Sequence, residues 1–292
     1  MGYSDAAAPP LGTWTTMPMK SRVRLWGLVL LTVGLWEGTG HALEYKLQAG
    51  LVAYRWTEDF DQGIPREAGP MLTLGGGVSG APSSMLPAVT LRAAAQFFVA
   101  RVNYDTFPNR PPYFSIHTHS TYLGFKYEGD AGWRAVFGSV GVEPFAGLTY
   151  RWWLRRIEST QIVAGYPELY NTIYGRVGLR ADHRFAPGSA AHAAFSIDPM
   201  LWAKERIDLS ETVVDDGIGG LVRGEEVTVK NGKRPGWTVE AGVQSGTLDL
   251  TAYWQVTRVG KSPRVRCYQG TSLCHQPASD QDIIGLNLGV AF

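Results

Sequence analysis

Apolar residues alternate with small or polar residues, with a period of two, along most of the chain after residue 42. In the stretch VEPFAGLTYRWWLRR the even-numbered positions from Val142 to Leu154 are mostly apolar, and the odd-numbered positions include Glu143 and Arg155. Successive side chains of a β-strand point to opposite faces, so each such segment has one apolar and one charged face. The alternation therefore predicts an all-β fold.

Ten segments carry this pattern, and a closed antiparallel barrel usually has an even number of strands. They are residues 43–56, 70–78, 88–104, 116–128, 140–157, 171–182, 191–207, 236–244, 248–260 and 282–292. Most of them reach the roughly 9 to 11 residues that a tilted strand needs to cross a bilayer. Residues 133–139 belong either to the fifth segment or to the turn before it.

The connections between these segments alternate in length. Those after the odd-numbered segments are long, namely residues 57–68, 105–115, 158–170, 208–235 and 261–281, whereas 128–132 and 245–247 are the tightest of the others. Transmembrane barrels place long loops outside and short turns in the periplasm, where both termini then lie. Asn231-Gly232, within the longest loop, predicts a two-residue hairpin.

The first 42 residues read as a leader, with the signal peptide proper over about residues 19–42. Three positive charges precede an apolar stretch from Leu25 to Trp36, and Gly40, His41 and Ala42 follow it. Twelve apolar residues are too few for a transmembrane helix. We therefore expect export through a cleaved signal peptide and one barrel domain over residues 43–292.

A soluble β-sandwich also alternates, so the aromatic and charged positions have to decide between the two. Six aromatic residues near strand ends form a candidate membrane girdle: Trp133, Tyr150, Trp152, Trp237, Trp254 and Phe292. The opposite faces carry Gly, Arg, Asp, Glu and Tyr at mid-strand depth. We predict a closed antiparallel transmembrane β-barrel of about ten strands, with a soluble secreted β protein as the alternative.

The last ten residues, IIGLNLGVAF, alternate strictly and end on an aromatic side chain. Leu286, Leu288, Val290 and Phe292 resemble the sorting signal of Gram-negative outer-membrane β-barrels, and the chain is similar to small opacity-type and OmpA-type barrels. The resemblance implies a bacterial outer-membrane location, recognition by the barrel assembly machinery, and contact with outer-membrane lipid and lipopolysaccharide.

Alternation also predicts which charged residues point into the barrel. Near the periplasmic end these are Glu44, Lys46, Lys126, Glu128, Glu143, Arg180, Asp182 and Asp249. Charges at membrane depth have to be paired, so we expect an ion-paired plug here. The net charge of +1 gives no reason to expect a nucleic-acid partner.

Near the extracellular end, alternation predicts a basic and aromatic cup. Its members are Arg151, Arg155, Lys204, Arg206, Trp153, Trp202, Tyr54 and Trp56. Guanidinium groups bind carboxylate or phosphate bidentately, so an anionic small molecule is the candidate ligand. Loop acids such as Glu58 and Glu158 are the alternative partners of these cations.

Cys267 and Cys274 are the only cysteines and lie close together, which predicts a disulfide in an exported protein. A metal site with His275 has too few ligands. The sequence has no phosphate loop, dinucleotide fingerprint or zinc-ligand spacing, so we expect no cofactor.

Catalytic patterns are weak. His117 and His119 share one strand face, but His119 and its neighbour Ser120 point to opposite faces, unlike the base and nucleophile of lipid A deacylase barrels. Omptin proteases use an aspartate pair, which Asp59 and Asp61 can supply, and an Asp-His pair at the outer rim. The adjacent Asp182 and His183 fall at the periplasmic end instead.

The leading hypothesis is a non-enzymatic outer-membrane barrel that acts through its loops and outer cup, by adhesion to a host surface partner or by capture of an anion. A narrow porin-like channel for small solutes is the alternative. A hydrolase of outer-membrane lipid or lipopolysaccharide is the third hypothesis.

Overall fold

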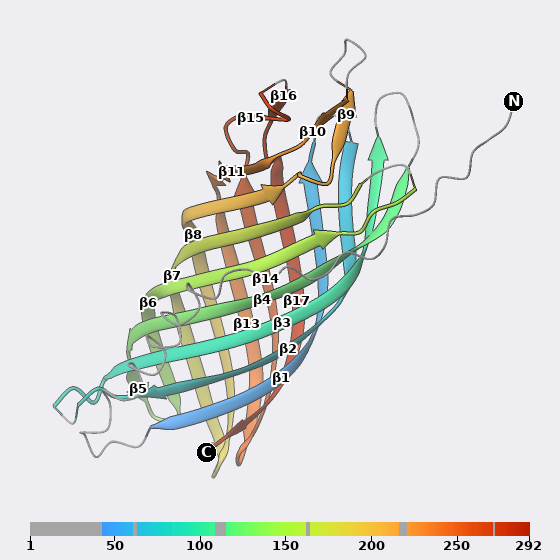
Figure 1. Ribbon diagram of the computed structural model, residues 1–292. Helices are drawn as coiled ribbons and strands as arrows, with labels where there is room; N and C mark the ends of the chain where they lie inside the picture. Colours follow the sequence, from blue (N-terminus) through green and yellow to red (C-terminus); the bar gives the residue numbers. More distant parts are fainter. Residues whose placement is uncertain are drawn as a thin grey trace, which may run out of the picture. The chain divides into compact units, whose positions relative to one another are not determined.

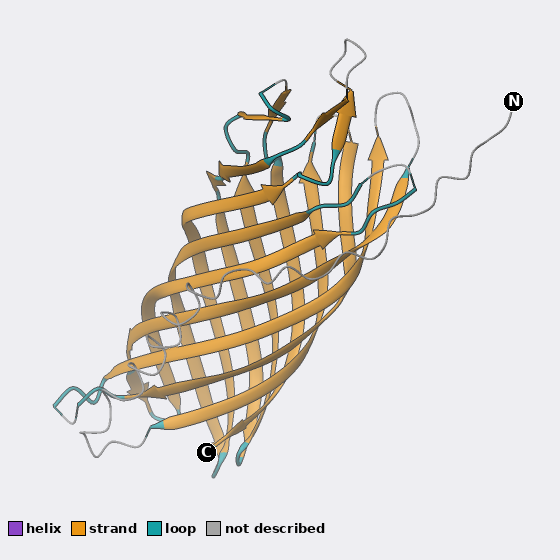
Figure 2. Ribbon diagram, in the orientation of Figure 1, coloured by secondary structure: helices purple, strands orange, loops and turns teal. Residues whose placement is uncertain are grey.

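The computed structural model describes residues 43–60, 63–83, 85–108, 115–161, 164–215, 221–270 and 272–292. These residues form strands and connecting segments, as Figure 2 shows. They contain no helix that is long and apolar enough to span a membrane. The expected leader, residues 1–42, lies outside the described residues.

Ten long strands form a closed antiparallel barrel, as predicted (Figure 1). They are β1 (Glu44–Asp59), β2 (Gly63–Gly80), β3 (Val89–Pro108), β4 (Ile116–Trp133), β6 (Val140–Ile157), β7 (Pro167–Ala186), β8 (Ser189–Asp208), β13 (Pro235–Ser245), β14 (Leu248–Gly260) and β17 (Ala278–Ala291). Each pairs with the next, and β17 pairs with β1, where Lys46 lies opposite Ala291. The ten strands overlap all ten predicted segments.

The described residues also form seven short strands. They are β5 (Ala135–Phe137), β9 (Val213–Asp215), β10 (Leu221–Arg223), β11 (Glu226–Lys230), β12 (Gly232–Lys233), β15 (Val265–Cys267) and β16 (Ser272–Cys274). β5 pairs with β6, so residues 133–139 form the end of β4 and a hairpin to β6. β9–β10 and β15–β16 are separate two-stranded hairpins.

One end of the barrel, here called the turn end, has tight turns at Gly138, Gly188 and Gly246, all with positive φ. Both ends of the described barrel lie there, since the backbones of Tyr45 and Phe292 are hydrogen-bonded to each other. The predicted turn at 245–247 is confirmed. The predicted turn at 128–132 is wrong, because these residues continue β4.

The other end, here called the loop end, has longer connections, but two predictions there are wrong. The predicted loop 57–68 is mostly strand, because Thr57 pairs with Arg66 and β1 and β2 extend to Asp59 and Gly63. The Asn231-Gly232 hairpin does not form. β11 pairs with β8 and β12 with β14, and the hairpin of this loop is β9–β10 instead.

A belt of apolar side chains covers the outside of the wall. On β17 its members Ile284, Leu286, Leu288 and Val290 are 43–58% exposed. On β1 the belt runs from Tyr45 to Ala53, and the next outward residue is Arg55; on β8 it ends at Trp202. We call this surface the apolar belt.

Candidate functional site

The turn-end half of the barrel contains a cavity of about 440 Å³. All eight charged residues predicted to face inward at this end line it: Glu44, Lys46, Lys126, Glu128, Glu143, Arg180, Asp182 and Asp249. Glycines and alanines, among them Gly77, Ala94 and Ala190, line other parts of its wall. Small side chains leave space that the longer charged ones do not fill. This half of the lumen is therefore polar and hollow.

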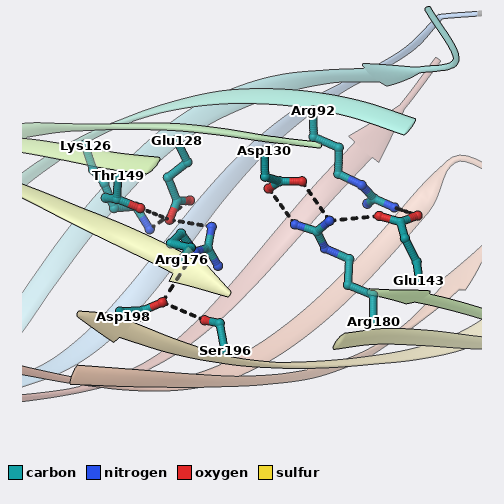
Figure 3. A network of polar contacts seen from close by, with 10 residues as sticks. All are labelled: Arg92, Lys126, Glu128, Asp130, Glu143, Thr149, Arg176, Arg180, Ser196 and Asp198. Carbon is teal, nitrogen blue, oxygen red and sulfur yellow. Dashed lines mark hydrogen bonds and ion pairs between the residues drawn. The ribbon is translucent and has the colours of Figure 1, made fainter. Parts of the chain in front are cut away.

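Arg180 is the centre of one ion-paired group in Figure 3. Its guanidinium donates to both carboxylate oxygens of Asp130 at 2.8 and 2.6 Å and to Glu143 at 2.9 Å. Arg92 donates to the other oxygen of Glu143 at 3.1 Å. The group ties together β3, β4, β6 and β7, and such bidentate charged bonds are among the strongest between side chains.

Arg176 is the centre of the second group in Figure 3. It donates to Glu128 at 2.9 Å and lies 3.7 Å from Asp198, while Lys126 lies 3.3 Å from Glu128. Lys126 and Glu128 belong to the set predicted to face inward, whereas Arg176 and Asp198 do not. Both follow the alternation of their strands, so the same pattern could have found them.

The ring of Phe145 packs against the guanidinium groups of both arginines. The guanidinium of Arg180 lies 3.7 Å from the centre of its ring and that of Arg176 lies 5.6 Å away. Gly178 makes room for this ring, since a Cβ there would lie 2.6 Å from Phe145 Cζ. The predicted ion pairs are thus present, but they surround a cavity and do not plug it.

The loop-end half of the lumen is closed by a layer of aromatic side chains. Trp56, Trp153, Tyr122 and Tyr170 are at most 1% exposed. Trp153 and Tyr170 stack with ring centres 4.7 Å apart. A second cavity, lined by Arg151, Tyr174 and Asp198, measures only about 10 Å³. We call these four residues the aromatic layer.

Arg155 lies beside this layer and holds three carboxylates at once. It donates to Glu67 at 2.6 Å, to Glu168 at 2.7 Å and to Glu58 at 2.9 Å, and its side chain is 1% exposed. Glu58 is a predicted partner of the cations of the cup, whereas Glu67 and Glu168 were predicted only as parts of loops. The predicted basic cup is therefore rich in acids.

Burial raises the pKa of Glu58 from 4.5 to about 7, and the charges of Glu168 and Glu67 act in the same direction. The nearby Arg155 opposes this rise. Glu58 lies beyond the apolar belt, near the end of β1. One guanidinium cannot fully compensate three buried carboxylates, so Glu58 binds its proton more tightly than a free glutamate does.

Arg151, another predicted member of the cup, is 6% exposed and has neutral partners. It donates to Thr257 Oγ1 at 3.2 Å and lies at 3.5 Å from Gln281 Oε1. Tyr54, Trp56 and Trp153 point inward, as predicted. They pack in the apolar core of the lumen.

Trp202, Lys204 and Arg206 were predicted to point inward, and this is wrong. A β-bulge in β8 is the cause: Ile173 pairs with Trp202, whereas the next residue, Tyr174, pairs with Met200. Leu201 and Trp202 are 45% and 39% exposed, so two consecutive residues face outward. Beyond the bulge the alternation is inverted. Whether any of the eight predicted cup residues binds a ligand stays a prediction, but they do not form one cup.

Because of this inversion, Glu205 points inward and is fully buried. The side-chain amide of Asn231 donates to its carboxylate at 3.0 Å. Asn231 is thus used to hold the fourth loop (209–234) against β8, which explains why it does not form the predicted hairpin turn. Burial raises the pKa of Glu205, which lies beyond the apolar belt, well above its ordinary value.

The fourth loop and the fifth loop (261–277) pack together over β8. Their apolar contact consists of Ile207, Leu209, Val227, Val229 and Cys267 with Val265 and Tyr268 around them. Cys267 and Cys274 form the predicted disulfide. The hydroxyl groups of Thr212 and Tyr268 lie 3.0 Å apart and join the two loops. We call these two loops the cap.

His117 and His119, on β4 at the loop end, face the outside of the wall. His117 Nδ1 lies 2.6 Å from Asp105 Oδ1, and His119 lies 3.9 Å from Glu158. Ser120 is buried and donates to Glu67, so it points away from His119, as predicted. Among the described residues no group of three or more His, Cys, Asp or Glu is placed to hold a metal ion.

The remaining catalytic candidates are far from a common site. Asp182 and His183 pair with His192 and Ala191 near the turn end, whereas Asp59 ends β1 at the loop end. Asp61 lies outside the described residues. The structure does, however, bring Asp105 and His117 together from neighbouring strands, a pairing that adjacency in the sequence could not reveal.

The last strand has the predicted orientation. Leu286, Leu288 and Val290 point outward, and Gly285 and Asn287 point inward. Phe292 stacks on Tyr45, with ring centres 6.1 Å apart, at the turn end. Its recognition as a sorting signal stays a prediction.

No family model matches the sequence. No curated protein matches it either. Among solved structures, the barrel is similar to the outer membrane protease OmpT from Escherichia coli, with a TM-score of 0.57 and 8% identity over 87% of this chain and 98% of that one. The translocator domain of autotransporter NalP from Neisseria meningitidis has a TM-score of 0.41 and 12% identity over 94% and 97% of the two chains.

The transport unit of the autotransporter AIDA-I from Escherichia coli has a TM-score of 0.40 and 9% identity over 90% and 97% of the chains. At these identities the likeness shows the fold alone. The likeness to OmpT supports the fold of outer-membrane barrels in general and not that of the small opacity-type and OmpA-type barrels specifically. The chain thus has the fold of a Gram-negative outer-membrane β-barrel.

Proposed function

We propose that this protein is a non-enzymatic outer-membrane barrel that acts through the surface of its cap. The observation that carries the proposal is the closed loop end: the aromatic layer fills the lumen, and the cap packs beside it. In this proposal the loop end faces the exterior and the turn end faces the periplasm, as in other barrels of this class.

The apolar belt supports a membrane location. Four leucines on neighbouring strands are 58–63% exposed: Leu47, Leu51, Leu72 and Leu74. Soluble monomeric proteins rarely expose so large an apolar surface. All ten wall strands are paired on both sides, as hydrocarbon requires. The girdle residues Trp133 and Trp254 are 58% and 47% exposed on the same outer surface.

The lumen supports a barrel without a through channel. The cavity is confined to the turn end, and Trp56, Trp153 and Tyr170 separate it from the loop end. A ten-stranded barrel is also narrow compared with open porins, which have about 16 to 18 strands. We therefore place the channel hypothesis second.

The cap supports an interaction surface. Leu221, Leu273 and Val213 on its two hairpins are 79%, 60% and 51% exposed, and they lie outside the apolar belt. Exposed apolar side chains on ordered loops are typical of protein interaction sites. The disulfide closes the β15–β16 hairpin, and the contact between Thr212 and Tyr268 joins the residue before β9 to it, so a host surface partner would meet a preformed surface.

Planar-bilayer recording of the purified barrel tests the closed lumen. We expect no discrete openings from the unmodified protein and openings from the W56A/W153A variant, since it lacks two indoles of the aromatic layer. Discrete openings of the unmodified protein would overturn the proposal in favour of the channel.

Labelling and adhesion assays on intact bacteria test the cap. An impermeant maleimide should label an L221C variant on intact cells, and a T247C variant, at a tight turn, only after permeabilisation. Bacteria that display the unmodified protein should adhere to cultured host cells several-fold better than bacteria with equal amounts of L221S/L273S. Reversed labelling, or adhesion that is equal in both strains, would contradict the proposal.

A further inference from the structure

Two lysines face each other on the outer wall, immediately beyond the apolar belt. Lys204 on β8 lies directly opposite Lys230 on β11 in the antiparallel register, and both are exposed. Like charges in this position repel each other and destabilise a sheet. Such a pair is expected to have an anionic partner.

The described part of the protein does not supply that partner. Among the described residues, no carboxylate forms an ion pair with Lys204 or Lys230. Other cations of this wall do have one: Arg206 lies 3.5 Å from Glu226, and Arg101 donates to both oxygens of Glu158 at 2.9 Å. Neither lysine of the pair has such an acid.

A third donor lies on the other side of Lys204. Asn171 on β7 is the residue opposite Lys204 in that pair of strands. The Oδ1 atom of Asn171 accepts a hydrogen bond from Tyr150 at 2.8 Å, so its amide nitrogen is left as a donor. Two ammonium groups and one amide form a row of donors, which suits the oxygens of a phosphate.

The position of these donors at the edge of the apolar belt indicates which kind of phosphate they bind. The last members of the apolar belt on β8 are Leu201 and Trp202, which precede Lys204 by three and two residues. They are 45% and 39% exposed. Tryptophan at the edge of an apolar belt is typical of the level of lipid headgroups. The β-bulge is what turns both Trp202 and Lys204 to the outside.

We propose that Lys204 and Lys230, with Asn171, form a binding site for the phosphate of a phosphorylated outer-leaflet glycolipid. The inference rests on the proposed membrane location and orientation, and it adds a specific ligand class to them. The phosphate neutralises the lysine pair, and the acyl chains of the same lipid lie along the apolar belt below it.

Titration calorimetry of the detergent-solubilised barrel with phosphorylated lipid A tests the site. We expect the affinity for this lipid to fall roughly 30-fold in K204Q/K230Q, because the loss of each lysine should weaken binding about fivefold. K204R/K230R should retain it, because the charges remain. K233Q removes a neighbouring exposed lysine, which lies opposite Val259, and should bind like the unmodified protein.

Two further probes identify the ligand. The same lipid stripped of its phosphates should bind far more weakly, and inorganic phosphate alone should bind weakly to all variants. Equal binding of the stripped lipid, tight binding of inorganic phosphate, or unchanged affinity in K204Q/K230Q would each overturn the proposal. If the double variant does not fold, as judged by its gel mobility before and after boiling, the comparison of K230Q with K233Q decides in its place.

A failure of this site leaves the proposed function testable by itself. Conductance and surface labelling do not depend on Lys204 or Lys230, so a closed, correctly oriented barrel with no lipid phosphate affinity would reject only the site. A barrel that conducts but binds the lipid through this pair would reject only the closed lumen.

Discussion

The two halves of the lumen contain similar side chains in different surroundings. At the turn end, Arg180 and Arg176 share their carboxylates with other cations beside a cavity of about 440 Å³. At the loop end, Arg155 alone faces Glu58, Glu67 and Glu168 next to the aromatic layer. The first arrangement tolerates water and the second excludes it, so the same kind of ion pair should matter more at the loop end.

The largest effect should come from Arg155→Met. The variant leaves three buried carboxylates without their cation, so we expect a loss of about 3–5 kcal/mol in the free energy of unfolding. Denaturant unfolding followed by tryptophan fluorescence measures it. R155K should lie in between, because a lysine cannot donate to three carboxylates with the same geometry. A loss below about 1 kcal/mol would mean that the carboxyls are neutral without Arg155.

The second effect concerns the disulfide. The C267S/C274S variant should destabilise the cap by about 2 kcal/mol, the value that the chain-entropy model gives for so short a loop. We expect faster hydrogen exchange in residues 261–277 and little change in the ten wall strands. A matching loss of protection in β1 or β17 would show that the cap and the wall unfold together.

The third effect is a dependence of stability on pH. Since burial raises the pKa of Glu58 to about 7 from 4.5, the folded state binds this proton more tightly than the unfolded chain. Stability should therefore be highest below about pH 4.5, fall as the pH rises to about 7 and then level off. The thermal midpoint measured across this range should change less in E58Q. An unfolding midpoint that rises with pH in the same window would contradict the assignment.

The smallest effect should come from Arg180→Gln at the turn end. Asp130 and Glu143 lose a partner there, but the adjacent cavity can admit water and Arg92 still binds Glu143. We expect a loss of about 1 kcal/mol, within the range for ion pairs that water can reach. A loss as large as that of Arg155→Met would remove the contrast between the two halves.

The sequence predicted the wall of this barrel well, because each strand has an apolar outer face and a different set of residues facing the lumen. The alternation ends where that difference ends. Residues 57–59 and 63–68 extend beyond the apolar belt and carry charged residues on both faces, so their strands were predicted as a loop. Glu67 was missed for the same reason.

The site was less predictable, since two of its features depend on contacts between distant strands. The cavity exists because Gly77, Ala94 and Ala190 are small on different strands, which no single segment reveals. The bulge at Leu201 and Trp202 adds one residue to β8, and the residues around it look regular in the sequence. The predicted orientation of Lys204 and Arg206 failed at this point.

The additional residue at the bulge changes which residues of β8 face the lumen. Below it, the even-numbered side chains of β8 point to the lumen, and above it the odd-numbered ones do. If β8 continued through the same residues in regular alternation, without the bulge, Glu205 would point outward and Lys204 and Arg206 would point inside, which would reverse the sign of the charge that β8 contributes to the interior. The conformation of the backbone at two residues, Leu201 and Trp202, thus decides whether this mouth is acidic or basic.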